Sequence, residues 1–431
     1  MPAPLKTDVA IIGAGIIGLA TALRLAAAGR EVLVVDPNEA GSGASYGNAG
    51  AIAPYGCAPI GNPDVLRNLP RLLFNPDSPL AIRPAAVAAL LPWLTRFLWQ
   101  SMPANARRNG RALAPLLKEA IPAWRELAEP SGVCDLFRHD GCLYVYREKM
   151  PPRHGDWAGR LRGELGIRQE WLTSAEVAEL EPALPATAGG LFFPDAAHIV
   201  DPSALTRRLA AAAQTQGALF QRARVARSQF QDNGHVRLMC PDLTIDARTV
   251  VLAAGAWSRF LARQAGENIP LDTERGYHIE FALSPCPIKR PISPVDLGFY
   301  VTPMEGRLRV AGTVELGGLS APPDPGRIAL LERGARKLFP DLGPVQSQWL
   351  GFRPSLPDSL PVIGRSRRQP NLIYAFGHGH LGMTLAGVTS RIVADLISDR
   401  GDGRDLSAFQ PDRFGRTVSG LMRDELSLNR F

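Results

Sequence analysis

A stretch near the N-terminus, "DVAIIGAGIIGLATALRLAAAGREVLVVD" at residues 8–36, constrains the fold more than any other part of the sequence. Residues 9–12 form a short, mostly β-branched apolar run, which is typical of a buried parallel strand. Three glycines follow in the pattern G-x-G-x-x-G: Gly13, Gly15 and Gly18. An apolar helical pattern then runs to Gly29, and a second apolar run ends at Asp36. The order strand, glycine loop, helix, strand predicts a Rossmann-type α/β unit.

Each part of this unit has a role in holding a dinucleotide. Gly13 allows a tight turn, Gly15 lets the backbone approach a pyrophosphate, and Gly18 lets the helix pack closely on the sheet. The helix N-terminus offers backbone N–H groups and partial positive charge to the phosphates. Asp36 is placed to accept hydrogen bonds from a ribose. We therefore expect a dinucleotide here, with a glycine turn that binds nothing as the alternative. The fingerprint alone does not distinguish FAD from NAD.

Four later segments extend the pattern. "SGASYGNAGAI" at 42–52 is a small-residue loop whose glycines suit close approach to a planar ring, although a plain flexible loop is the alternative. "HIVDPSALTRRLAAAAQTQGALFQRARV" at 198–225 contains a helix start, an apolar helix, a glycine stop and a strand. "TVVLAAGAWS" at 249–258 is a buried strand running into Ala-Gly. "LIYAFGHGHLGMTLAGVTSRIVADLIS" at 372–398 reads as strand, glycine loop and helix.

Together these segments resemble the D-amino-acid oxidase superfamily of FAD enzymes, most closely its bacterial D-amino-acid dehydrogenase and glycine-oxidase-like branch. The resemblance covers nearly the whole chain and is most specific in "VDPSAL", "VVLAAGAWS", "GFRPSLPDSLPVIGR" and "GHGHLGMT". It implies that the backbone of Val225 contacts adenine and that residues 378–384 lie against the flavin ring. With the fingerprint, the FAD contacts we expect are Gly13, Ala14, Gly15, Ile16, Ile17, Gly18, Asp36, Pro37, Ser45, Asn48, Ala49, Gly50, Val225, Ala254, Gly255, Gly379, His380, Leu381, Gly382, Met383 and Thr384.

The C-terminal loop also has a physical rationale of its own. A helix that begins near Met383 points its N-terminal N–H groups back at the loop, where they would stabilise negative charge on a reduced flavin. His378 and His380 in this loop could be considered as metal ligands. Two histidines without a carboxylate cluster are too few, so we expect no metal.

The expected fold class is α/β, with a Rossmann-type FAD-binding domain interleaved with a mixed-sheet α+β substrate domain. The FAD-binding domain is predicted to comprise residues 1–85, 196–270 and 346–431. The substrate domain is predicted to comprise residues 86–195 and 271–345. Within it, strands are expected at 141–148 and 298–315, with Gly306 in a hairpin turn.

An arginine in "WLGFRPSLPDSLPVIGR", residues 349–365, is the leading substrate contact. The glycine and prolines predict a bent loop around Arg353, whose guanidinium has no neutral form near pH 7 and needs an anion if buried. In the resembled family, the arginine of this motif binds the substrate α-carboxylate, and a guanidinium can do so through two parallel hydrogen bonds. The alternative is a structural salt bridge, for which Asp358 is close in sequence.

Three further side chains complete the expected catalytic set around Arg353. Tyr277 and Tyr300 are candidates for a lid or a carboxylate contact, although tyrosine also belongs in a sheet core. His380 occupies the place where the glycine-oxidase branch has a second arginine. Arg275 could supply that missing contact, or it could be a solvated surface residue.

The resemblance implies dehydrogenation at a carbon that bears nitrogen, with hydride transfer from Cα to flavin N5 and release of an imine or a 2-oxo acid. The protein would orient and polarise while the flavin supplies the chemistry. A D-α-amino acid is the leading substrate. The alternatives are a cyclic or N-substituted amino acid (D-proline, D-hydroxyproline, sarcosine or glycine), a flavin-binding electron-transfer subunit of a larger complex, and a NAD-dependent dehydrogenase.

Composition narrows the partners. The net charge is +7, but it is dispersed, and no basic stripe with a matching motif indicates nucleic acid. The five cysteines are scattered, which favours reduced thiols in the cytoplasm.

We see no signal peptide and no membrane-spanning run. Residues 85–125 are apolar and helical in pattern, typical of core or of a peripheral membrane contact. None of the five lysines falls in a flavin-facing motif, which favours quinone or another carrier over oxygen as acceptor.

Overall fold

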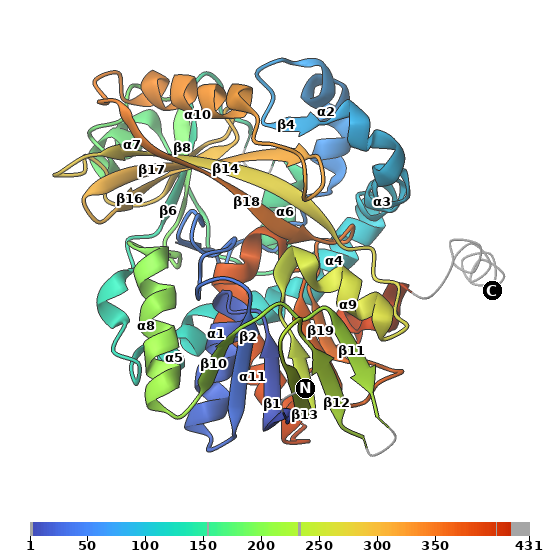
Figure 1. Ribbon diagram of the computed structural model, residues 1–431. Helices are drawn as coiled ribbons and strands as arrows, with labels where there is room; N and C mark the ends of the chain where they lie inside the picture. Colours follow the sequence, from blue (N-terminus) through green and yellow to red (C-terminus); the bar gives the residue numbers. More distant parts are fainter. Residues whose placement is uncertain (1–2, 153–154, 232–233, 402, 415–431) are drawn as a thin grey trace.

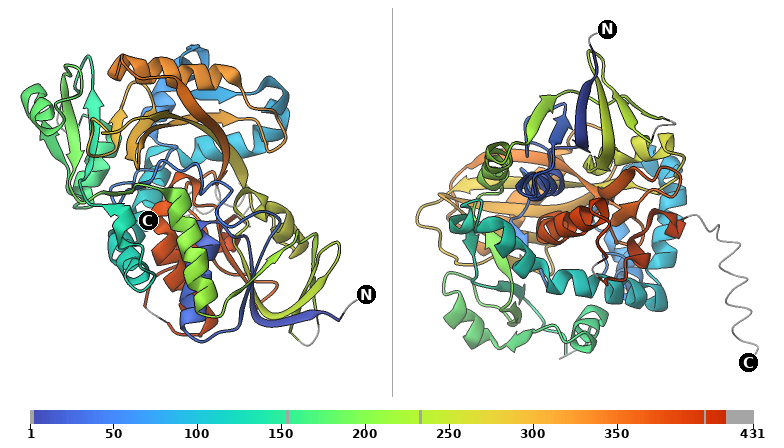
Figure 2. Two further views of the ribbon diagram at one scale, coloured as in Figure 1. Left: turned by 60° about the vertical axis from the view of Figure 1, so that its left-hand side comes forward. Right: turned by 90° about the horizontal axis from the view of Figure 1, so that it is seen from below.

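The computed structural model describes residues 3–152, 155–231, 234–401 and 403–414. Two large sheets form two layers, one above the other in Figure 1. Figure 2 shows the same layers from the side and from below. Each sheet draws its strands from several separate parts of the chain, which confirms the predicted interleaved α/β architecture.

The lower layer is an eight-stranded sheet in the order β10-β2-β1-β13-β12-β11, with β20 also beside β13 and β19 beside β20. Its strands are β1 (Leu5–Ile12), β2 (Val32–Asp36), β10 (Leu219–Arg222), β11 (Arg227–Phe230), β12 (Val236–Met239), β13 (Thr244–Leu252), β19 (Val362–Arg365) and β20 (Leu372–Phe376). β10, β2, β1, β13 and β20 run parallel. Their carboxyl ends therefore meet at one edge, where open α/β sheets bind ligands.

Both faces of this sheet are buried. Ile11 of β1 packs against the cluster formed with α1 (Ile16–Ala27), α8 (Pro202–Thr215) and α11 (Gly382–Ile397). Ala10, the next residue along, points to the opposite cluster, which includes α9 (Ser258–Gln264). This two-sided burial explains why the strand reads as a continuous apolar run rather than an alternating one. α4 (Pro103–Lys118) and α5 (Ala120–Ala128) pack on α11.

The upper layer is a nine-stranded, mostly antiparallel sheet in the order β18-β14-β17-β16-β15-β6-β8-β7, with β4 also beside β17. Its strands are β4 (Leu80–Ile82), β6 (Cys142–Tyr146), β7 (Glu170–Leu172), β8 (Gly189–Phe193), β14 (Asp272–Ala282), β15 (Ile292–Pro294), β16 (Phe299–Met304), β17 (Arg307–Leu316) and β18 (Val345–Ser355). α10 (Pro325–Leu338) covers its outer face (Figure 1). The hairpin of β16 and β17 turns at Gly306, with φ +67°, as predicted.

The remaining elements lie around the two layers. The helices are α2 (Pro63–Phe74), α3 (Val87–Gln100), α6 (Trp157–Glu164) and α7 (Ser174–Leu180). A small three-stranded sheet has the order β3 (Ala51–Ile52), β9 (Ala197–Ile199) and β5 (Phe137–Arg138).

The segment around Arg353 is not the bent loop that we predicted. Residues up to Ser355 form β18, which pairs along its length with β14, and the bend begins only at Leu356. β18 is an edge strand of the upper sheet. Pro354 is tolerated there because an edge strand has a side without ladder hydrogen bonds. The arginine is therefore fixed by a sheet instead of by a loop.

Strand pairing differs from the expected domain limits at two places. β4 precedes residue 85 but pairs with β17 in the upper sheet. β18 follows residue 345 but pairs with β14 there. Residues 415–431 of the expected final segment lie outside the described residues. The five-segment division of the chain remains a prediction.

Candidate active site

The glycine loop between β1 and α1 lies at the carboxyl edge of the lower sheet. Gly13 has φ +110°, in the left-handed region, and a Cβ there would collide with the carbonyl oxygen of Ala253. A Cβ on Gly18 would collide with the carbonyl oxygen of Gly13. Gly15 is the N-cap of α1 and brings no side chain to its first turn. The tight turn and the close packing of helix on strand both require glycine, as in dinucleotide-binding loops.

Asp36 and Val225 lie at the same edge, beside this loop. The Asp36 carboxylate accepts hydrogen bonds from the backbone N–H of Ala14 at 2.8 Å and of Asn38 at 2.8 Å. Arg222, at the end of β10, is the strand-pairing neighbour of Asp36 at the end of β2, and Val225 follows three residues later. Among the described residues, no hydrogen bond engages the backbone N–H or C=O of Val225. Its backbone is thus available to a ligand.

The small-residue loop connects the two helix N-termini. The Ser45 hydroxyl accepts a hydrogen bond from the Ile16 N–H in the first turn of α1, at 2.9 Å. Asn48 accepts one from the N–H of Gly50 at 2.8 Å, which folds the loop on itself. Just beyond, the Ala53 N–H donates to the Thr384 hydroxyl in the first turn of α11, at 3.0 Å. Three segments distant in sequence thus meet here.

The C-terminal loop follows β20 as a short 3-10 turn, η4 (Gly379–Leu381), and α11 begins at Gly382. His378 is buried and its Nε2 lies 2.9 Å from the Thr389 hydroxyl, so this ring is tied to α11. Burial lowers the pKa of His378 to about 3. The His380 side chain is exposed and lies close enough to Arg353 to feel its charge. Desolvation and the neighbouring Arg353 charge lower the pKa of His380 to about 4, so it is neutral at pH 7.

Arg353 reaches across the upper sheet from its edge. Gly276 of β14 lies next to the guanidinium, and a Cβ there would collide with Cζ and both terminal nitrogens. The guanidinium continues to β17, where Nη1 donates to the carbonyl of Thr313 at 2.9 Å. β16 is the next strand, with Tyr300 pairing with Ala311. The cation therefore lies on the sheet face that holds Gly276 and Glu274, held by carbonyls rather than by a carboxylate.

No carboxylate among the described residues lies within ion-pair distance of Arg353. The alternative partner, Asp358, is paired with Arg413 at 2.8 Å. Glu274, the cross-strand neighbour of Arg353, bonds Ser355 through Oε1 at 2.7 Å, and its Oε2 has no partner. Burial raises the pKa of Glu274, while the Ser355 hydrogen bond and the Arg353 charge oppose that rise. Burial also lowers the pKa of Arg353. Within the described residues the charge of Arg353 is therefore not paired at ion-pair distance, and Glu274 acts on it only at longer range.

Tyr300 belongs to a cluster of hydroxyls that the sequence did not reveal. Its hydroxyl lies 2.6 Å from that of Tyr144 and 3.2 Å from that of Tyr55. Tyr55 in turn donates to the Cys142 thiol at 3.1 Å and stacks on Phe193. Burial raises the pKa of all three tyrosines, so they remain neutral donors. "CLYVY" predicted a strand, but no spacing links it to Tyr55.

Tyr277 and Arg275 point to the opposite face of β14, so their expected roles need correction. The Tyr277 hydroxyl donates to Glu315 at 2.5 Å and accepts from the Asp324 N–H at 3.0 Å, and its ring is in the core beneath α10. Arg275 is fully buried and pairs with Glu315 at 2.8 Å. Arg275 is thus neither a substrate contact nor a surface residue. Side chains alternate along a strand, so neither shares the face of Arg353.

The comparisons with known proteins agree with this geometry. The sequence model of the DAO family, described as FAD dependent oxidoreductase, matches residues 8–396. The chain belongs to this family. Its cofactor is therefore FAD, and it is an oxidoreductase, as the resemblance implied.

Curated relatives of this DAO-family chain match it almost end to end. A protein named D-amino-acid oxidase from Bradyrhizobium diazoefficiens is 35% identical over 426 residues, covering 95% of this chain and 100% of its own. One named D-amino acid dehydrogenase from Paramagnetospirillum magneticum is 35% identical and covers 94% and 98%. Among solved structures, glycine oxidase from Geobacillus kaustophilus aligns with a TM-score of 0.74 at 25% identity, covering 95% of this chain and 99% of that one.

The residues at the carboxyl edge of the lower sheet fit FAD. The glycine positions that a Cβ would block, the open first turn of α1 and the free Val225 backbone suit the pyrophosphate and adenine parts. Ala254, after β13, lies beside Gly13, and Gly255 follows it in the chain. The described residues contain no group of three His, Cys, Asp or Glu side chains that could hold a metal ion.

Proposed function

We propose that this DAO-family enzyme oxidatively deaminates a D-α-amino acid. The observation that carries the proposal is Arg353, a partly buried cation on the inner face of the upper sheet with no carboxylate partner among the described residues. A guanidinium in this position binds a carboxylate through charge-assisted hydrogen bonds. The names of the D-amino-acid oxidase and dehydrogenase relatives support the same substrate class.

The protein's own residues would bind and orient the substrate. Arg353 would hold the α-carboxylate, and His380, neutral at pH 7, would lie beside it without competing for that charge. Tyr300 would offer a neutral hydroxyl from the same face of the sheet. Such positioning is worth several kcal/mol of the barrier. FAD, when bound, would supply the acceptor for the hydride of the substrate Cα, and no side chain would need to act as a strong base.

A dye-reduction screen over D-, L- and N-substituted amino acids tests this function. Purified protein carrying FAD should reduce the dye fastest with a D-α-amino acid. Preference for D-proline, D-hydroxyproline, sarcosine or glycine would redirect the proposal to a cyclic or N-substituted substrate. Absence of turnover with every amino acid, in protein that retains FAD, would favour an electron-transfer subunit. We also expect acid precipitation to release all the flavin, because no His or Cys adjoins the Ser45–Gly50 loop as an attachment residue.

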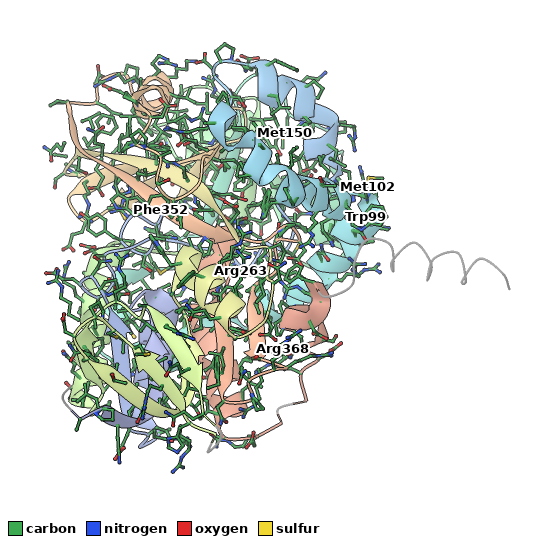
Figure 3. All side chains as sticks on the ribbon, turned by 45° about the vertical axis from the view of Figure 1, so that its right-hand side comes forward. Trp99, Met102, Met150, Arg263, Phe352 and Arg368 are labelled. Carbon is green, nitrogen blue, oxygen red and sulfur yellow. The ribbon has the colours of Figure 1, made fainter. Side chains whose placement is uncertain are left out.

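For the electron acceptor, we propose quinone or another carrier, reached by peripheral contact with a membrane. No helix among the described residues is long and apolar enough to cross one. However, α3 and its C-terminal end expose Leu91, Leu98, Trp99 and Met102, and Phe74 at the end of α2 is 84% exposed. Figure 3 shows Trp99 and Met102 near one another at the outer edge of the molecule. Exposed arginines nearby would suit anionic lipid: Arg67, Arg71, Arg107 and Arg108.

Two measurements test the acceptor. Substrate-reduced enzyme is mixed in a stopped-flow instrument with air-saturated buffer and, separately, with a soluble quinone; reoxidation by oxygen at the rate of turnover would make this an oxidase. Flotation with anionic vesicles should recover the wild type but less of a Leu98→Gln/Trp99→Gln variant. Leu219→Gln, at an exposed leucine of β10 in the other layer, is the matched control and should float like the wild type.

A further inference from the structure

The loop Tyr46–Gly50 is held from above by three neighbouring strands of the upper sheet. Arg309 of β17, which is only 1% exposed, donates from Nη1 to the carbonyl of Asn48 at 2.6 Å and to that of Tyr46 at 3.2 Å. His278 of β14 has its Nδ1 3.1 Å from the carbonyl of Gly47. Trp349 of β18 covers Gly47 so closely that a Cβ there would collide with the indole.

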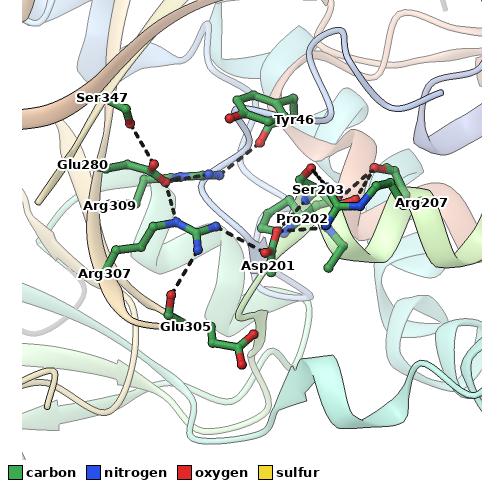
Figure 4. A network of polar contacts seen from close by, with 12 residues as sticks. Tyr46, Asp201, Pro202, Ser203, Arg207, Glu280, Glu305, Arg307, Arg309 and Ser347 are labelled. Atoms are coloured by element: carbon green, nitrogen blue, oxygen red, sulfur yellow. Dashed lines mark hydrogen bonds and ion pairs between the residues drawn. The ribbon is translucent and has the colours of Figure 1, made fainter. Parts of the chain in front are cut away.

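Glu280 of β14 organises these contacts. Its carboxylate bonds Arg309 at 2.8 Å and the Ser347 hydroxyl at 2.8 Å (Figure 4). The same carboxylate binds Arg307 at 2.9 Å, and Arg307 extends to Asp201 at 3.5 Å. Asp201 is the N-cap of α8 in the lower layer. One carboxylate of the upper sheet is therefore linked to two separate segments of the lower layer.

Burial by itself would raise the pKa of Glu280. The Arg309 charge and the hydrogen bonds from Ser347, Arg309 and Arg307 overcome that effect and lower the pKa to about 2. The carboxylate is thus ionised throughout the neutral range, and the linkage is permanently charged.

An ion pair at this depth needs an explanation other than stability. Replacing a buried pair with apolar side chains is often neutral or stabilising, because desolvation cancels most of the attraction. Here the arginine also satisfies two backbone carbonyls of the loop, whose one large side chain, Tyr46, packs near His278 and Trp349. The hydrogen bonds add a directional constraint on the loop backbone, which apolar packing, being non-directional, does not supply.

We propose that Arg309, held by Glu280, is a positioning residue that sets the flavin-facing loop Tyr46–Gly50 for FAD binding. This rests on the proposed FAD contacts of Ser45, Asn48, Ala49 and Gly50, and not on the identity of the substrate. Arg309 binds the backbone from the side of the upper sheet, and Ser45 binds Ile16 of α1 at the start of the loop. The loop is thus held from both layers.

The test compares Arg309→Met and Arg309→Lys with a matched control, Arg290→Met. Arg290 forms a similar buried pair with Glu181 at 2.6 Å and donates to the carbonyl of Asp140 at 2.8 Å, and neither partner is in the loop. Apoprotein of each variant is titrated with FAD, and amide hydrogen exchange of residues 45–50 is measured in the apoprotein. Thermal melting reports overall stability.

We expect Arg309→Met to weaken FAD binding at least tenfold and to speed exchange across residues 45–50. Arg309→Lys keeps a charge for Glu280 but loses the fork to two carbonyls, so its FAD affinity should be intermediate. Arg290→Met should leave both readouts within about threefold of wild type, whatever its melting temperature. A folded Arg309→Met or Arg309→Lys protein with wild-type FAD affinity and wild-type exchange overturns the proposal. Failure of the D-amino-acid screen leaves these readouts interpretable, because neither uses a substrate.

Discussion

The guanidinium of Arg353 lies directly over the bare backbone of Gly276, its neighbour on β14. The two residues are on adjacent strands, where Gly276 pairs with Gly351 and Arg353 with Glu274. Because glycine has no side chain, the arginine can lie along the sheet and reach the carbonyl of Thr313 on the strand beyond. Backbone groups therefore fix the position of the Arg353 guanidinium. A substrate carboxylate would bind it without first breaking a salt bridge.

The first prediction follows from this contact. Gly276→Ala should displace the Arg353 guanidinium, because the new methyl group would occupy its position. We expect kcat/KM for the amino acid to fall by about one to two orders of magnitude, which corresponds to roughly 1.4 kcal/mol per factor of ten. FAD content should not change. Gly343→Ala is the control, since a Cβ at Gly343 meets no atom within 4 Å. Equal kinetics in both variants would contradict the role that we give to Gly276.

The second prediction concerns the charge itself. Arg353→Ala should weaken transition-state binding by several kcal/mol. We therefore expect kcat/KM to fall on the order of a hundredfold or more, while the flavin stays bound. Arg353→Lys keeps the cation but loses the planar fork, so it should recover only part of the loss. Steady-state kinetics and the flavin absorbance of the purified variants check this. Near-normal kcat/KM in the alanine variant would mean that the arginine is structural.

The parts of the fold that depend on local pattern could be predicted from the sequence. The strand, glycine loop, helix and acid at residues 8–36 each have a local physical signature, and they form a single unit in the structure. The position of Arg353 on a strand could not be predicted in this way. Gly351 and Pro354 indicate a loop locally, and only pairing with β14, some eighty residues away in sequence, overrides them.

The same limit separates Tyr277 from Tyr300. Both occur in strand-like segments, and sequence alone does not say which face of the sheet is the inner one. The structure shows which face each tyrosine occupies. Tyr277 packs under α10, whereas the hydroxyl of Tyr300 is hydrogen-bonded to those of Tyr144 and Tyr55. Helices 85–125 illustrate a similar ambiguity, because Trp93 is buried while Trp99, on the same helix, is exposed.

The third prediction uses these two tyrosines. Tyr277→Phe removes the donor to Glu315 inside a buried cluster, so it should lower the melting temperature but leave kcat/KM within about threefold of the wild-type value, because a lost buried hydrogen bond costs roughly 1–3 kcal/mol of stability. Tyr300→Phe also removes a hydroxyl from a buried cluster and should lower the melting temperature, but in addition it should lower kcat/KM by more than threefold. Melting curves and kinetics of the two variants, measured side by side, check the contrast. A Tyr277→Phe enzyme with a normal melting temperature and a low kcat/KM would show that Tyr277 acts in the active site after all.

The fourth prediction is a pH dependence of stability that originates at His278. Desolvation, with a smaller effect of the Arg309 charge, lowers the pKa of this buried histidine from 6.5 to about 4. Between pH 6.5 and pH 4 the unfolded chain therefore binds a proton that the folded chain does not, and stability falls as the pH falls. From pH 7 to pH 5 this histidine should lower the free energy of unfolding by about 2 kcal/mol.

His278→Asn keeps an N–H near the position of Nδ1 but cannot titrate, so its melting temperature should drop less between pH 7 and pH 5 than that of the wild type. His198 and His378 are present in both proteins, and their contributions cancel in the comparison. If the melting temperatures of wild type and variant fall equally between pH 7 and pH 5, His278 has an ordinary pKa and is not buried against the loop.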